Sequence, residues 1–241
     1  MLLWLTDYLS DFVRAFSVFQ YLTLRSMVSA MTALLLSLII GPIFIEKLSR
    51  QQIGQRVRLD GPESHLTKDG TPTMGGGLII VVITIATLFW GDLSNRYIWL
   101  VLSVTCAFGL IGWLDDYLKI LRQNSDGLSA RWKIFWQTIV ALSASSYLYM
   151  TADMAIQTDL IVPFFKEVAL PLGFGFIVFS SLMLVGMSNA VNLTDGLDGL
   201  AILPTVMVGG GLGLIAYLVC LLYTSDAADE GLGVDLGGRR I

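Results

Sequence analysis

The chain has 241 residues, of which 55% are hydrophobic and 14% are charged. Its mean hydropathy is +0.72 and its formal net charge is −4. This composition excludes an ordinary soluble domain and indicates that lipid is the solvent for most of the chain. Two cysteines, Cys106 and Cys220, exclude a disulfide framework and a cysteine-rich metal site. No nucleic-acid partner is expected.

The first 19 residues predict an amphipathic helix that lies in the membrane interface. Its apolar side chains recur at helical spacing: Leu5, Tyr8, Leu9, Phe12, Val13 and Phe16. The segment lacks a positively charged start and carries Asp7 and Asp11, so a cleaved signal peptide is not expected. A helix that faces water is the alternative interpretation.

Six charge-free apolar segments follow, each close to the ~20 residues that a helix needs to cross a bilayer. They cover residues 27–45, 74–91, 97–114, 134–150, 169–187 and 200–219. Soluble cores rarely contain several such segments, so buried helices of a large soluble protein are the weaker interpretation. The sequence therefore predicts an all-α polytopic membrane protein with six transmembrane helices in this chain.

Basic residues predict the orientation of these spans. They cluster between spans one and two and between spans three and four: Lys47, Arg50, Arg56, Arg58, Lys68, Lys119, Arg122, Arg131 and Lys133. Loops rich in Lys and Arg face the cytoplasm, so the N-terminus is expected outside. By alternation the loop at 188–199 is cytoplasmic as well. Three polar segments, 60–73, 114–131 and 189–198, are thus expected on one side of the membrane.

Asp115 and Asp116 follow directly on the third predicted span, at the level of the lipid headgroups. Adjacent carboxylates repel, and a hard cation such as Mg²⁺ would relieve that repulsion, since it binds through carboxylates and substrate phosphate. Acids at a helix C-terminus are also unfavourable with respect to the helix dipole. The sequence predicts a magnesium-binding pair here, and two solvated acids at a helix end are the alternative.

A second polar cluster lies between the fifth and sixth spans. It contains two amides and two carboxylates together with glycines: Asn189, Asn192, Asp195, Asp198, Gly196 and Gly199. Amides and carboxylates bind ribose, base or phosphate-bound metal, and glycines let the backbone approach a ligand. A polar turn with helix caps would need some of these residues but not all of them.

The segment before the second span carries His65, Lys68 and Thr73, followed by three glycines. Backbone N–H groups at a glycine-rich helix start, together with a lysine, suit a pyrophosphate or a lipid phosphate. Taken singly, each of these residues is explained as well by an ordinary loop or a helix start.

Four strings carry a resemblance that covers roughly residues 1–217. They are GPESH at 61–65, GTPTMGG at 70–76, DDY at 115–117 and NLTDGLDG at 192–199. In this order and spacing they resemble the phospho-N-acetylmuramoyl-pentapeptide-transferase family, within the polyprenyl-phosphate N-acetylhexosamine-1-phosphate transferase superfamily.

The resemblance implies a multi-pass enzyme of the bacterial inner membrane with a cytoplasmic active site. Such an enzyme joins UDP-N-acetylmuramoyl-pentapeptide to undecaprenyl phosphate with Mg²⁺ and releases UMP. It makes the first lipid-linked precursor of peptidoglycan and so serves cell wall biogenesis, cell shape, cell division and the cell cycle. Membrane lipid surrounds it, and whether it forms a homodimer is left open.

The resemblance also assigns roles to residues. It implies that Asp115 and Asp116 are catalytic and hold the metal. The expected substrate-binding residues are His65, Lys68, Thr73, Asn189, Asn192, Asp195 and Asp198. Either an acid activates the lipid phosphate oxygen, or a covalent phospho-aspartyl intermediate forms, and the sequence leaves both routes open.

The chain also departs from the family pattern. The family has about ten spans, and its third essential acid and its histidine-rich loop lie beyond the sixth. We therefore expect residues 1–219 to be a truncated transferase domain that is inactive alone. The Gly-rich residues 220–241 resemble translated read-through of a library adapter and are expected to carry no function.

Three other functions remain alternatives. A sister enzyme transfers N-acetylglucosamine-1-phosphate to the same lipid, and it shares the acidic pair and a DGxDG segment. A transporter would need charged groups near the bilayer midplane, whereas the acids here lie at span ends. A non-catalytic membrane fragment is the third alternative.

Overall fold

The computed structural model describes residues 2–50, 74–122, 127–162, 169–194 and 200–218. Of these residues 84% are helical, which confirms the prediction of a mainly α-helical membrane protein. The chain divides into two compact units, Met1–Val185 and Gly186–Ile241. The four long helices of the first unit are α2 (Leu22–Arg50), α4 (Gly75–Trp90), α5 (Arg96–Arg122) and α6 (Ala130–Met150).

The N-terminal segment contains two short helices, so the prediction of one continuous helix over residues 1–19 was wrong. Helix α1 (Leu2–Ser10) is followed by the 3₁₀ helix η1 (Arg14–Gln20). Between them Val13 is extended, with φ −136° and ψ 109°. A β-branched residue loses side-chain freedom in a helix, which favours a break at this position. The Phe19 ring stacks on Trp90 at 5.6 Å and joins this segment to α4.

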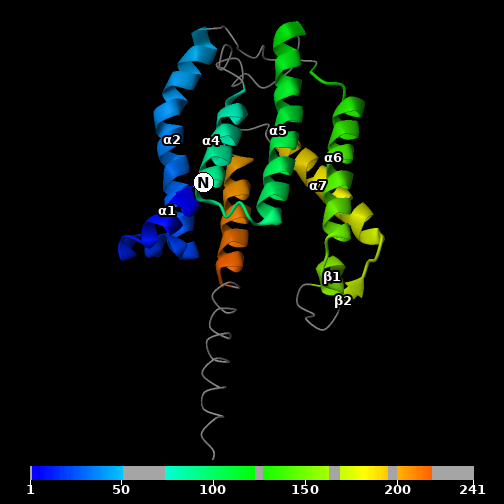
Figure 1. Cartoon of the computed structure of the whole chain (residues 1–241). Coiled ribbons are helices and arrows are strands. Elements are labelled where there is room, and N and C mark those ends of the chain that lie inside the picture. The colour runs from blue at the N-terminus through cyan, green and yellow to red at the C-terminus, as the bar shows by residue number, and fades with distance from the viewer. Residues whose placement is uncertain (1, 51–73, 123–126, 163–168, 195–199, 219–241) are drawn as a thin grey trace, which may run out of the picture. The chain divides into compact units, whose positions relative to one another are not determined.

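The four long helices of the first unit lie side by side in chain order, and their directions alternate (Figure 1). Side-chain hydrogen bonds join neighbours: Trp90 Nε1 donates to Thr32 Oγ1 at 3.0 Å between α4 and α2. The small core contains Val82, Leu102 and Ala141. Because the directions alternate, the end of α5 and the start of α6 lie at the same end of this row as the start of α4.

Three helices within the described ranges are long and apolar enough to cross a membrane: α2, α5 and α7 (Gly175–Thr194). The other predicted spans fall on α4, on α6 and on the helix Ile202–Leu218. Two of these, α4 and Ile202–Leu218, are apolar but shorter. Most apolar side chains on α2 point away from the protein, as expected where lipid replaces water. The count of six spans remains a prediction.

A small hairpin precedes α7 and was not predicted. After the 3₁₀ helix η2 (Ala155–Thr158), strand β1 (Asp159–Ile161) pairs antiparallel with β2 (Ala169–Pro171), with Leu160 opposite Leu170. Gly173 then turns the chain at φ +50°, a conformation that suits glycine. The predicted span at 169–187 therefore begins as a strand, and its helix starts only at Gly175.

Candidate functional site

The two predicted catalytic acids lie inside a helix. Helix α5 continues past Asp115 and Asp116 for nearly two turns and ends at Arg122, so placing the acids at the helix end was wrong. The residues that follow the acids are mostly good helix formers. Lys119 and Arg122 in the last turn also interact favourably with the helix dipole. The acids thus have a rigid backbone beneath them.

Lys119 lies between the two carboxylates. Its Nζ is 2.8 Å from Asp115 Oδ2 and 2.9 Å from Asp116 Oδ1. These spacings of four and three residues place all three side chains on one helix face. The side chain of Asp115 is 14% exposed, that of Lys119 28% and that of Asp116 38%. One ammonium group therefore relieves the repulsion of two acids, and the trio keeps an excess negative charge.

The described residues just before α6, 127–129, complete this site. The backbone N–H of Leu128 donates to Asp115 Oδ1 at 2.7 Å, and Arg122 Nη1 donates to the Gly127 carbonyl at 3.3 Å. Lys133, in the first turn of α6, adds electrostatic attraction to Asp115. The carboxylate of Asp115 is thus held by groups from α5 and from the connection to α6.

Aromatic side chains lie on the same helix as the acids. Trp113 and Tyr117 stack in parallel, with ring centroids 5.2 Å apart, and both are partly exposed. Such rings are typical of the level where lipid headgroups begin. The start of α4 is also close, because a Cβ added at Gly77 would lie 3.9 Å from Trp113. The described start of α4 therefore lies against the helix that carries the acids.

The donor chemistry of the acid pair fits Mg²⁺. Carboxylate oxygens are its preferred ligands, and it often binds through one or two carboxylates plus substrate phosphates. No group of three or more Asp, Glu, His or Cys side chains that suits a metal occurs among the described residues. Asp115 and Asp116 would therefore hold such an ion only together with ligands from elsewhere.

Two predicted nucleotide-side residues lie on α7. Asn189 and Asn192 belong to its last two turns, whereas the sequence placed them in a loop. They are three residues apart and so share one face of the helix. Thr194 Oγ1 donates to the Val191 carbonyl at 2.8 Å in the last turn. The remaining predicted site residues, His65, Lys68, Thr73, Asp195 and Asp198, lie outside the described residues.

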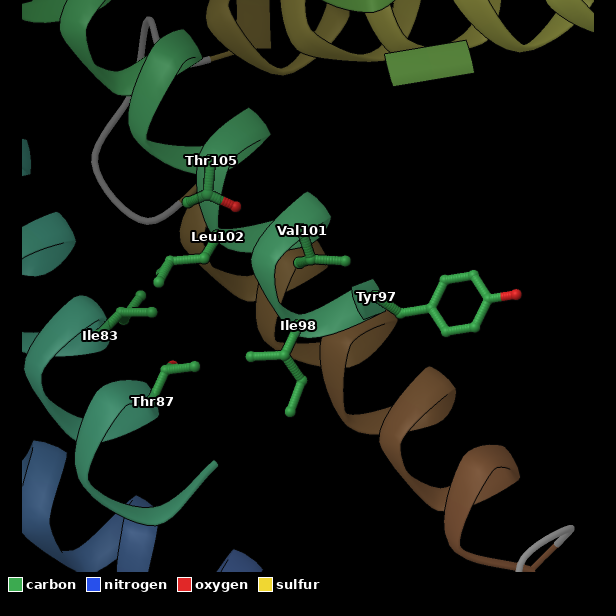
Figure 2. Close-up of a pocket in the computed structure, with 7 residues that line it drawn as sticks. All are labelled: Ile83, Thr87, Tyr97, Ile98, Val101, Leu102 and Thr105. Carbon is green, nitrogen blue, oxygen red and sulfur yellow. The ribbon is translucent and has the colours of Figure 1, made fainter. Parts of the chain in front are cut away.

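Two cavities of the first unit lie away from the acid pair. One, of about 290 Å³, opens between α4 and α5 and is lined by Ile83, Thr87, Tyr97, Ile98, Val101, Leu102 and Thr105 (Figure 2). The other, of about 530 Å³, is lined by residues of α1 and of the connection between α4 and α5, among them Asp7 and Asp92. Hydrogen bonds from the Ser94 hydroxyl and backbone lower the pKa of Asp92. Neither cavity contains a residue predicted for chemistry.

Three members of the acid site were not predicted from the sequence. Lys119 was counted only as a loop cation, although its spacing from Asp115 would have indicated an ion pair on a helix. Gly127 and Leu128 act through their backbone, which leaves no signal in side-chain type.

Comparison with known proteins gives one family. Residues 98–229 match glycosyl transferase family 4, which is more than half of the chain. The chain belongs to glycosyl transferase family 4. The activity of the family is the transfer of a sugar phosphate to a polyprenyl phosphate, so the chain is a membrane transferase of this class. The matched residues of this family 4 chain include the acid pair, all of α6 and all of α7.

Proposed function

We propose that this family 4 chain transfers phospho-N-acetylmuramoyl-pentapeptide from its UDP donor to undecaprenyl phosphate at the cytoplasmic face of a bacterial inner membrane. The observation that carries the proposal is the shielded trio of Asp115, Lys119 and Asp116 near the end of an apolar helix. The GPESH and GTPTMGG strings support the muramoyl donor in particular. The product would be the first lipid-linked precursor of peptidoglycan.

The reaction asks the protein mainly to position two anionic substrates and to neutralise charge. An oxygen of the lipid phosphate forms a bond to the sugar-bearing phosphorus of the donor, and the bond from that phosphorus to UMP breaks. Asp115, held by two partners, is the better placed acid to accept a proton from the lipid phosphate. Lys119, which lies between the two acids, is proposed to offset charge on the same phosphate oxygens.

Mg²⁺, when held by Asp115 and Asp116, would supply further positive charge for the donor pyrophosphate. Lys68, Thr73 and His65 are proposed to bind phosphate oxygens. Asn189, Asn192, Asp195 and Asp198 are proposed to bind the nucleotide. A phospho-aspartyl intermediate is the second route. Failure to trap any phospho-enzyme by rapid quench during turnover would count against it.

The test is Mg²⁺-dependent UMP release in membranes that contain the chain, undecaprenyl phosphate and the muramoyl-pentapeptide donor. A version extended beyond residue 219 by the family's remaining helices is assayed beside it, because the third acid is expected there. Asp115→Asn is the inactive reference, and Asp153→Asn is the matched control, since Asp153 follows α6 and pairs with Arg96 at the other end of α5. Mg²⁺-dependent release that Asp115→Asn abolishes supports the proposal, and no release in either version contradicts it.

N-acetylglucosamine-1-phosphate transfer to the same lipid is the second candidate, since that enzyme shares the acidic pair and the DGxDG segment. Competition between the two UDP donors separates the candidates. If UDP-N-acetylglucosamine alone is consumed, the muramoyl proposal is wrong and the family assignment still stands.

A further inference from the structure

The two oxygens of Asp115 have separate partners on separate parts of the chain. Oδ2 lies 2.8 Å from Lys119 on the same helix, and Oδ1 accepts the Leu128 N–H at 2.7 Å from the connection to α6. One contact would leave the carboxylate free to rotate about its terminal bond, which has a broad energy minimum. Two contacts on different oxygens fix its plane, as a catalytic group requires.

Gly127 makes this arrangement sterically accessible. A Cβ added there would lie 2.8 Å from the Asp115 carbonyl oxygen and closer still to Asp115 Oδ1. A side chain at this position would therefore occupy the space that the carboxylate needs. Arg122 at the end of α5 donates to the Gly127 carbonyl and holds the connection against the helix.

We propose that Gly127 and Leu128 are positioning residues for Asp115, with the Leu128 N–H orienting the carboxylate and Gly127 allowing the close approach. The role in catalysis rests on the proposed function, in which Asp115 acts on the lipid phosphate. The hydrogen bond itself is a property of the fold, and it is tested separately.

The first experiment measures hydrogen exchange at the Leu128 amide, with the 241-residue chain in lipid nanodiscs. Asp115→Ala removes the acceptor and should speed exchange at Leu128 by about tenfold or more, because a lost hydrogen bond opens the amide. Asp115→Asn keeps an acceptor oxygen, and Asp116→Ala leaves Asp115 intact, so both should preserve the slow rate. The Lys133 amide, bonded to the Ser129 carbonyl, is the internal control. Equal Leu128 rates in the Ala, Asn and unaltered proteins would overturn the proposal.

The second experiment removes the donor instead, in the version that shows UMP release. Leu128→Pro deletes the N–H, whereas Leu128→Ala keeps it. Ser129→Pro adds a proline to the same connection, where φ is already −60°. We expect kcat to fall about tenfold or more in Leu128→Pro, with little change in KM, and neither control to lose more than about twofold.

The two experiments separate the claim that the Leu128 hydrogen bond forms from the claim that it positions Asp115 for catalysis. If Leu128→Pro does not fold, Gly127→Ala replaces it and should give the same loss of kcat, since it displaces the same carboxylate. Unchanged kcat in both variants would overturn the positioning role and leave the proposed function intact. If the unaltered extended protein shows no turnover, the proposed function and the catalytic role of Leu128 are both overturned. Hydrogen exchange at the Leu128 amide would still show, in that case, whether the hydrogen bond to Asp115 forms.

Discussion

Each end of helix α5 carries a cation that forms ion pairs, and the two ends differ in what that cation contacts. At the N-terminal end Arg96 Nη2 donates to the Thr151 carbonyl and to Asp153 Oδ2, both at 2.7 Å, and its guanidinium lies 5.1 Å from the Tyr97 ring centre. The Asp153 side chain is 72% exposed. This end joins α5 to the residues after α6 with one acid for one cation.

At the opposite end one cation serves two acids, and all three side chains belong to the same helix. These two ion pairs lie within one helix, and the contact with the chain just before α6 comes from the Leu128 backbone. Two acids that share one ammonium group keep a surplus negative charge, and ion pairs this exposed add little to stability. Under the proposed function, the Arg96 end serves packing and the acid end serves chemistry.

The largest expected effect is loss of activity in Asp115→Asn. The substitution keeps the shape of the side chain but removes its charge and its capacity to accept a proton. We expect kcat for UMP release to fall roughly 10²–10⁴-fold, the usual range for an acid or base in catalysis. Asp153→Asn changes an acid at the other end and should leave kcat unchanged. Equal losses in the two variants would remove the distinction between the ends.

Lys119→Met is expected to have the next largest effect. It leaves two adjacent carboxylates without their shared ammonium group and removes a cation from the proposed phosphate site. Activity should fall roughly tenfold to a hundredfold, as for loss of a charge-stabilising group. Lys119→Arg keeps the charge and should retain most of the activity. Full activity in Lys119→Met, with normal dependence on Mg²⁺, would show that the lysine has no part in the reaction.

The sequence predicted the helical segments because apolar runs of membrane length are a strong signal. The same signal placed Asp115 past the end of its span. An apolar run ends at the first charged residue, whereas a helix continues for as long as its residues favour helical structure. Asn189 was placed in a loop by the same error. Loss of hydropathy marks the edge of the lipid, and it does not mark the end of a helix.

The acid pair could be recognised from residue type alone, but its surroundings could not. The Leu128 contact is made by a backbone N–H, which every residue except proline carries, so the identity of Leu128 gives no indication of it. The two strands are three residues long, and the second forms the start of the predicted span at 169–187, so the signal for a helix masked the hairpin.

Gly127→Ala tests the close approach at the acid end by its effect on stability. The added Cβ must displace the Asp115 backbone or side chain, and overpacking of this kind costs about 1–3 kcal/mol. Gly112→Ala is the matched control on α5, since a Cβ there meets nothing within 4 Å and alanine favours a helix. In nanodiscs, the thermal unfolding temperature should be lower for Gly127→Ala than for the unaltered protein, and it should not be lower for Gly112→Ala. The same unfolding temperature for both variants would mean that the connection moves away without cost.

The smallest expected effect is that of Arg96→Gln, and it completes the comparison. An exposed ion pair gains little because water and salt screen it, so the unfolding temperature should fall slightly at low salt and less at high salt. A double-mutant cycle with Asp153→Asn separates the ion pair from the contacts of Arg96 with Thr151 and Tyr97, because only the ion pair appears as a non-additive part. UMP release should be unchanged throughout. A loss of kcat in Arg96→Gln at unchanged stability would mean that this end also takes part in the reaction, and the division between packing and chemistry along α5 would not hold.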